Sequence, residues 1–247
     1  MSEDSSNTGG LFMLGFFLAV GLIVSAMFLS NAFKTIKSSN QTIEVKGYAE
    51  KNIVSDLGVW NCNIHTRAFD MVTAYDKLKN DIQKAKEYIL SKGINADDIT
   101  ISSVNSQKIF KMNDEGRYTN LIIGYELDQT IKVSSKDIKL IQLLSNEATS
   151  LIENGIEIFS EPPQFFYTKL NDLKVQMLGE ATKDAKVRAE QLAKNSGSEV
   201  GKLKSARQGV FQITPINSVD VSDYGEYDLS TIEKSIKAVV TIEFSIE

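Results

Sequence analysis

The 247-residue sequence contains a single cysteine, Cys62, and a single histidine, His65. One cysteine forms no internal disulfide, which excludes a disulfide scaffold and leaves the redox compartment undecided. A zinc site built on this pair needs two more carboxylate ligands, and no suitable spacing is visible. A thiol–imidazole pair is therefore the first chemistry to test.

Cys62 and His65 both fall in a predicted strand, where successive side chains point to opposite faces. Cys62 shares a face with Trp60 and Ile64, whereas His65 lies on the other face. Because a reactive thiol needs an exposed, electropositive setting, the pattern favours a buried structural cysteine over a nucleophile. We predict no catalytic residue, and the chain is not expected to be an enzyme.

The chain also lacks an excess of positive charge, with a formal net charge of −5. One predicted helix carries five lysines: Lys77, Lys79, Lys84, Lys86 and Lys92. Asp76, Asp81 and Glu87 intervene, which favours a solvated face over a phosphate-binding surface. The glycines are isolated, so neither GxGxxG nor GxxxxGK[ST] occurs. We predict no nucleic-acid partner and no cofactor.

Residues 219–230, VDVSDYGEYDLS, gather acidic side chains and tyrosines. The acids are Asp220, Asp223, Glu226 and Asp228. The spacing does not match the twelve-residue calcium loop, which needs acids at alternating positions and a final bidentate Glu. It favours a solvated loop, with no metal site. Tyr224 and Tyr227 are candidates for a partner interface, where tyrosine is enriched.

The run from Leu11 to Phe33 contains no charged residue. Its length is sufficient to cross the roughly 30 Å hydrocarbon layer as one helix. A cleaved signal peptide is the alternative, and Ser30-Asn31-Ala32 fits its small-x-small cleavage site. A signal has a shorter apolar region behind a basic segment, whereas MSEDSSNTGG is acidic, so we favour a retained anchor. Residues 1–10 are expected to be a disordered tail, and 34–41 a linker.

Beyond the linker, hydrophobic periodicity predicts strands and helices in a mixed order. Strands are expected from residue 42 and over 57–67, a hairpin over 99–112 and 121–134, a strand interrupted at Pro162-Pro163, and strands over 203–213 and 236–246. Helices are expected over 71–92, 136–154 and 171–195. This order predicts the α+β class, with antiparallel sheets and packed helices. The domain spans 42–247, and its similar halves, about 42–155 and 156–247, suggest an internal duplication.

The first of these helices has Asp70 as its N-cap and Gly93 as its stop. Its apolar stripe predicts a core face: Met71, Tyr75, Leu78, Ile82, Ala85 and Ile89.

The third helix has Asn171 as its expected N-cap and a stop at Asn195 to Gly197. Its predicted packing face is mostly small: Leu178, Ala181, Ala185, Ala189, Leu192 and Ser196. An alanine stripe lets the helix backbone approach a sheet closely. The opposite face carries charged pairs at four-residue spacing, Asp184 to Arg188 and Glu190 to Lys194, which support an exposed helix.

The stretch KDAKVRAEQLAKNSGSEVGKL within and after this helix resembles the signature of the SIMPL-domain family, the YggE-like proteins of bacterial envelopes. The pattern DAxxRAExLAxxxGxxxG is met by Asp184, Ala185, Arg188, Ala189, Glu190, Leu192, Ala193, Gly197 and Gly201. The resemblance covers about residues 41–247. It implies a SIMPL-like α+β fold, an envelope compartment, homo-oligomerisation and a role in stress tolerance, and it carries no accepted catalytic residues.

The orientation of the anchor has two opposing indications. Lys34 and Lys37 follow the apolar run, while Glu3 and Asp4 precede it, so the positive-inside rule places the domain in the cytoplasm. The resemblance places it outside, and we favour a single-pass inner-membrane protein with a periplasmic or extracytoplasmic domain.

Two functions follow as hypotheses. One is a non-enzymatic envelope protein that assembles and supports envelope integrity, and the other is a binding module for a peptide, lipid or small ligand of other envelope proteins.

Overall fold

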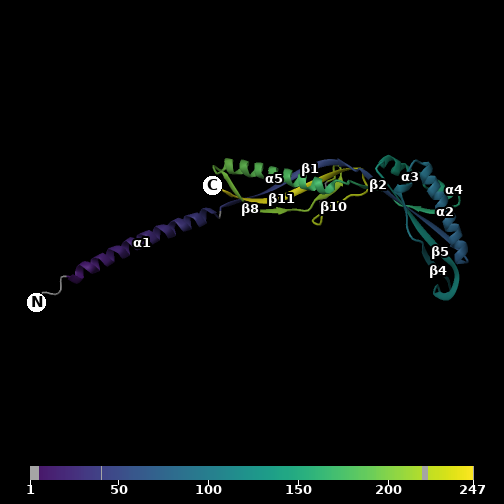
Figure 1. The fold of residues 1–247 in the computed structure, drawn as a ribbon, viewed down its shortest axis with the longest axis horizontal. Helices are drawn as coiled ribbons and strands as arrows, with labels where there is room; N and C mark the ends of the chain where they lie inside the picture. Colours follow the sequence, from purple (N-terminus) through teal and green to yellow (C-terminus); the bar gives the residue numbers. More distant parts are fainter. Residues whose placement is uncertain (1–5, 40, 219–221, 247) are drawn as a thin grey trace. The chain divides into compact units, whose positions relative to one another are not determined.

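The computed structural model describes residues 6–39, 41–218 and 222–246 (Figure 1). The chain forms two compact units, each assembled from separate stretches of sequence. The first combines residues up to Ala49 with Gln176–Gly209 and the stretch from Ala238. The second combines Glu50–Val175 with Val210–Lys237. Both units place helices against mainly antiparallel sheets, which confirms the predicted α+β class.

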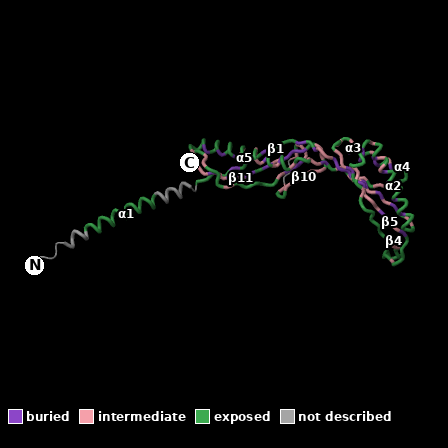
Figure 2. The backbone as a smooth tube through the Cα atoms, viewed as in Figure 1, coloured by how far each residue is buried: buried purple, intermediate pink, exposed green. Residues whose placement is uncertain are grey.

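An apolar helix, α1 (Ser6–Ser39), precedes the folded units. Its stretch Phe12–Ser30 has a mean hydropathy of 2.5 and is exposed throughout, as Figure 2 shows. Such a helix is long and apolar enough to be a membrane anchor or a signal sequence. It continues to Ser39 through residues expected to form a linker. Residues 1–5 of the expected tail lie outside the described chain.

The first unit packs one long helix, α5 (Leu170–Asn195), on a sheet. In this sheet β11 (Glu233–Ile246) lies between β1 (Thr42–Val54) and β8 (Val200–Gln208), and β8 pairs with β11 antiparallel. The strands alternate buried and exposed residues, as expected where one face is covered. The inward residues of β11 are Ala238, Val240, Ile242 and Phe244.

The packing face of α5 differs in part from the predicted one. Ala181, Ala185 and Ala189 are fully buried as predicted, but Leu192 is 54% exposed and Ser196 is also exposed. Met177 and Ala193 are buried with the three alanines, and Leu178 is only half-buried. The contact therefore follows strict four-residue steps, the ridge that runs obliquely to the helix axis. The helix begins at Leu170, so Asn171 is inside it and is not its cap.

The second unit contains a six-stranded sheet. Its strands are β2 (Leu57–Ala68), β3 (Ile99–Ile101), β4 (Asn105–Met112), β5 (Tyr118–Ser135), β6 (Glu157–Ser160) and β7 (Gln164–Phe166). The central pair β2–β5 stays in register from Gly58 opposite Ser135 to Ala68 opposite Tyr125. The predicted hairpin is present, and the break before Pro162-Pro163 separates β6 from β7. Two further strands, β9 (Gln212–Pro215) and β10 (Glu226–Tyr227), pair in parallel, and β9 also pairs with the start of β11.

Helices α2 (Met71–Ser91), α3 (Ile138–Glu147) and α4 (Ser150–Glu153) cover one face of the six-stranded sheet, together with the short 3-10 turn η1 (Ala96–Asp98). The core between them is built from large side chains, including Trp60, Ile64, Leu78, Ile131 and Leu144. The predicted helix over 136–154 is divided in two, and the predicted strand over 203–213 is divided between β8 and β9.

Helix α2 begins as predicted, because Asp70 Oδ1 accepts a hydrogen bond of 2.9 Å from the Thr73 backbone N–H. Its predicted core stripe is correct from Leu78 onward. Met71 and Tyr75 are 44% and 48% exposed, and the fully buried residue of the first turn is Ala74. The helix therefore meets the sheet through a small residue at its start, and the larger neighbours remain outside the contact.

Candidate functional site

The SIMPL-like signature residues of α5 hold strand β1 against the helix. Gly47 is buried so close to α5 that an added Cβ would lie 2.0 Å from the Ala181 carbonyl O and 2.7 Å from the Ala185 Cβ. Beside it, the backbone N–H of Tyr48 donates to Asp184 Oδ2 at 2.8 Å. Glycine and alanine are therefore required here for a close helix–strand approach.

Asp184 joins two parts of this contact. Its Oδ2 also accepts from Arg188 Nε at 2.7 Å, one turn further along α5. The Tyr48 N–H and the Arg188 guanidinium lower the pKa of Asp184, and partial desolvation opposes them. This carboxylate thus caps a backbone donor of β1, the strand at the edge of its sheet. The signature residues thus act in folding, through packing and hydrogen bonding.

Cys62 lies in the core of the second unit, away from His65. The thiol is fully buried, and burial raises its pKa to about 12. His65 occupies the opposite face of β2, in register with Asp128 on β5 and Glu157 on β6. Asp128 in turn accepts a hydrogen bond of 2.9 Å from Asn105 Nδ2. The two residues are therefore not brought together as a dyad.

The lysines of α2 and its C-cap residue Lys92 have varied surroundings. Lys92 Nζ lies 2.6 Å from Glu147 Oε2 and 5.2 Å from the centre of the Tyr88 ring. Asp81 is only 4% exposed, and burial raises its pKa, while Lys77 and Lys84 act in the opposite direction. Asp81 is thus partly withdrawn from the outer face, where the sequence placed it among the lysines.

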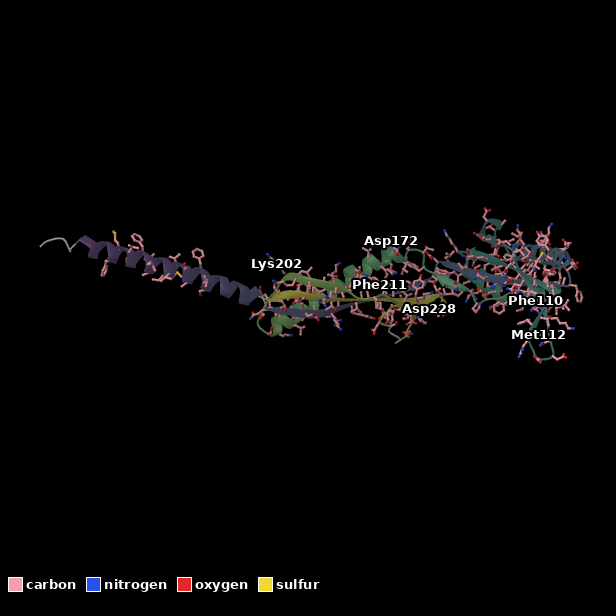
Figure 3. The ribbon with its side chains drawn as sticks, turned by 90° about the horizontal axis from the view of Figure 1, so that it is seen from below. Phe110, Met112, Asp172, Lys202, Phe211 and Asp228 are labelled. Atoms are coloured by element: carbon pink, nitrogen blue, oxygen red, sulfur yellow. The ribbon has the colours of Figure 1, made fainter. Side chains whose placement is uncertain are left out.

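The tyrosine-rich loop is held by hydrogen bonds around Asp228, which Figure 3 labels. The Asp228 carboxylate accepts from Ser230 N and Oγ at 2.8 and 2.7 Å, and from Thr231 Oγ1. Burial alone would raise the pKa of Asp228, but these hydrogen bonds outweigh it and the pKa is lowered. Tyr224 is 97% exposed, and Asp220 lies outside the described residues.

A buried lysine, Lys234, holds the segment around Asp228 through hydrogen bonds. Lys234 is 2% exposed, and its ammonium donates to the backbone carbonyls of Phe165 and Asp228. Desolvation lowers the pKa of Lys234, and the charge of Asp228 opposes that effect. The Phe165 N–H also donates to the Leu229 carbonyl at 2.8 Å. Segment 228–230 is therefore fixed beside β7.

Between this segment and the Pro162-Pro163 turn lies an open groove of about 600 Å³. Two of its exposed side chains are aromatic, with Phe159 60% exposed and Tyr227 45% exposed. The sequence indicated Tyr227 as an interface residue, but it gave Pro162-Pro163 only as a bend and missed Phe159. The signal in the sequence that could have indicated the groove was the pair of prolines, because a break at a sheet edge leaves room for a groove.

The described residues contain no group of three or more His, Cys, Asp or Glu side chains arranged as metal ligands. Asp223 is exposed, and Asp228 is engaged by its own turn. The groove offers aromatic contact from Phe159 and Tyr227 and polar contact from Glu161, Gln164 and Ser230.

Comparison with known proteins identifies the family. The family model SIMPL, described as a protein of unknown function (DUF541), matches residues 43–244, and the chain therefore belongs to the SIMPL family. No curated protein matches the chain. Similar solved structures include the de novo designed protein Foldit4, with 15% identity and a TM-score of 0.21 over 42% of this chain and 93% of that one. A hydrolase from Listeria innocua has 9% identity and a TM-score of 0.17 over 80% and 91%. Both scores are too low to support an inference about function.

Proposed function

We propose that this protein is a membrane-anchored, non-enzymatic SIMPL protein of the cell envelope, which assembles through its folded domain and supports envelope integrity or stress tolerance. The observation that carries this proposal is the use of the signature residues. Ala185, Asp184 and Arg188 of the signature pack or cap secondary structure, and Gly47 is the residue of β1 that they contact. Residues used in this way maintain the fold, and this use supports a structural role over a catalytic one.

The anchor is the second part of the proposal. Helix α1 supplies an exposed apolar surface over Phe12–Ser30, and it is retained in the mature protein with the folded units outside the cytoplasm. Intact mass of the membrane-extracted protein tests retention, and a mature chain that begins near Phe33 contradicts it. Protease treatment of intact spheroplasts tests orientation. Digestion of the domain without lysis supports an extracytoplasmic domain, and protection until lysis contradicts it.

The stress role is tested in cells. Deletion of the gene is expected to increase sensitivity to detergent and oxidant, and the full-length protein is expected to restore resistance. A variant that lacks residues 1–33 keeps the folded units but loses the anchor, so it is expected to fail in restoring resistance. Equal resistance with and without the gene contradicts the role.

A binding module is the second candidate, because the groove beside Tyr227 presents two aromatic rings and two prolines at the surface. Tyrosine and exposed aromatic residues are enriched where proteins bind one another. A photo-reactive amino acid at position 227 tests this function in cells, and Tyr224 supplies the matched control because it is 97% exposed and does not line the groove. A cross-linked partner specific to position 227 supports a binding module, and equal labelling at both positions contradicts it.

A further inference from the structure

The groove beside Tyr227 adjoins the face of the six-stranded sheet that lies opposite helix α2. Trp60 and Ile64 of β2 point into the core under α2, so the alternate residues of this strand point to the other, outer face. Phe159 of β6 lies in register with one of these alternate residues, Asn63, and it also lines the groove. The groove and the outer face of β2, β5 and β6 therefore form one continuous surface.

Strand β6 carries an acid–aromatic–acid pattern on this outer face. Glu157, Phe159 and Glu161 occupy alternate positions. Between them, Ile158 packs against the core, and Ser160 Oγ accepts a hydrogen bond of 2.9 Å from the buried Trp60 indole. Alternate residues of a strand lie about 6.5 Å apart, so the pattern places an aromatic ring between two carboxylates along a line of about 13 Å.

Acidic side chains outnumber basic ones on the outer face. The charged residues there are the acids Glu126, Asp128, Glu157 and Glu161 and the bases Arg67 and Lys132. Arg67 Nη2 lies 2.8 Å from Glu126 Oε1 and also attracts Glu157. One of the two bases is therefore already engaged, and the face keeps an excess of negative charge.

The groove continues this negative charge. Glu161 and Asp228 line it, and no lysine or arginine does so among the described residues. Glu161 Oε2 accepts from Asn61 Nδ2 at 2.9 Å, and the Asp228 carboxylate is held by its own turn. Lys234 attracts Asp228 from within the protein, where it is 2% exposed. The accessible charges of the groove are thus anionic, and they lie beside the rings of Phe159 and Tyr227.

We propose that the Tyr227 groove and the adjoining face of β6 bind a basic, extended segment of a partner protein, whose lysine or arginine side chains contact Phe159, Tyr227 and Glu161. The inference rests on the proposed binding module and names the chemistry of its partner.

Charge and spacing select this occupant. A cation is attracted by the face of an aromatic ring as well as by a carboxylate, so Phe159 and Glu161 suit the same side chain. An extended chain projects every second side chain toward the sheet, at the spacing of Glu157, Phe159 and Glu161. The groove is open, so it suits a chain that lies along it better than a small ligand, which needs enclosure.

Isothermal titration calorimetry of the full-length protein in neutral detergent tests the interface with a defined probe. The probe is a short peptide of alternating lysine and threonine, and two matched peptides replace lysine by glutamine or glutamate. The lysine peptide is expected to bind, and to bind more weakly as the salt concentration rises, whereas the other two are not expected to bind. Equal binding of the lysine and glutamine peptides, or no binding at about 1 mM lysine peptide, overturns the basic specificity.

Variants of the protein locate the binding. Phe159→Ala is expected to weaken lysine-peptide binding about five-fold, and Glu161→Gln about three-fold. Phe69→Ala and Glu153→Gln are the controls, because they remove an exposed ring and an exposed carboxylate of the same unit that do not line the groove. Far-ultraviolet circular dichroism and Trp60 fluorescence establish that each variant is folded. Unchanged binding in both groove variants, or equal losses in the controls, overturns the site.

The photo-cross-link at position 227 separates this inference from the binding module itself. A cross-linked partner specific to position 227, without binding of the lysine peptide, overturns the basic segment and leaves the binding module standing. Equal labelling at positions 227 and 224, together with no peptide binding, overturns both.

Discussion

Helices α5 and α2 pack on their sheets in opposite ways. In the first unit, α5 meets β1 through alanines, and Gly47 lies almost against the helix backbone. In the second unit, α2 meets β2 and β5 through Leu78, Ile82 and Ile89. Close backbone approach leaves no room for added atoms, whereas a core of large side chains depends on each atom that fills it. The two units are therefore expected to be sensitive to opposite kinds of substitution.

The largest effect is expected from removing atoms in the second unit. Leu78 is 1% exposed, so Leu78→Ala leaves a cavity and is expected to lower the free energy of unfolding by about 2–5 kcal/mol. Urea unfolding followed by Trp60 fluorescence measures this, because the only tryptophan lies in the same core. Leu192→Ala is the control, because it removes the same atoms at an exposed site. An equal loss of unfolding free energy in both variants would contradict the expected sensitivity of the buried core.

Adding atoms to α5 is expected to have the next largest effect. Ala185→Leu overpacks the contact with Gly47 and is expected to cost about 1–3 kcal/mol. Lys186→Leu is the control, because its side chain is 63% exposed and leucine and lysine have similar helix propensities, so a change within about ±0.5 kcal/mol is expected.

Urea unfolding followed by circular dichroism compares these two variants. Identical midpoints would show that the alanine stripe is not a packing face. A stable Ala185→Leu monomer that has lost its oligomeric state would instead identify the stripe as an assembly surface, and the comparison between the units would need revision.

A smaller effect is expected at Cys62. Cys62→Ser places a hydroxyl in an apolar core and is expected to cost about 0.5–2 kcal/mol, since the backbone partly compensates it. Because burial raises the Cys62 pKa above its usual 9.0, the group stabilises the fold below pH 9 and this contribution is lost as the pH rises toward about 12. Thiol labelling checks burial: native protein is expected to react far more slowly than denatured protein, and equal rates would contradict it.

The smallest effect is expected at Asp184, whose side chain is one-third exposed to solvent. Its pKa is lowered from the usual 3.8, so its contribution to stability is complete above that value and is lost as the pH falls through the lower, folded pKa. Asp184→Asn is expected to flatten the pH dependence of unfolding in this acidic range. Lys183→Gln, one residue earlier, is the charge-changing control, and an unchanged acid profile in Asp184→Asn argues against the bond to Tyr48.

Local patterns in the sequence were sufficient for most of the architecture. Alternation placed Trp60 and Cys62 in the core, Asp70 marked the start of α2, and the signature of α5 predicted the family. The pattern did not reveal that the α5 contact runs along four-residue steps, because that direction depends on the angle between helix and sheet. The Tyr227 groove was only partly predictable, since Phe159 and Tyr227 are far apart in sequence and meet through tertiary structure. The predicted halves, 42–155 and 156–247, stay a prediction.

The order in which the chain is synthesised has a consequence for the first unit. Its central strand is the part of β11 from Ala238 onward, whereas β1 is made almost two hundred residues earlier. The second unit needs nothing beyond Lys237. The first unit therefore closes last. Until then, β1 and the alanine face of α5 lack the central strand of their sheet. If α1 enters the membrane as it emerges, the protein is already tethered while this unit is still open, and any chaperone that protects β1 has to act beside the bilayer.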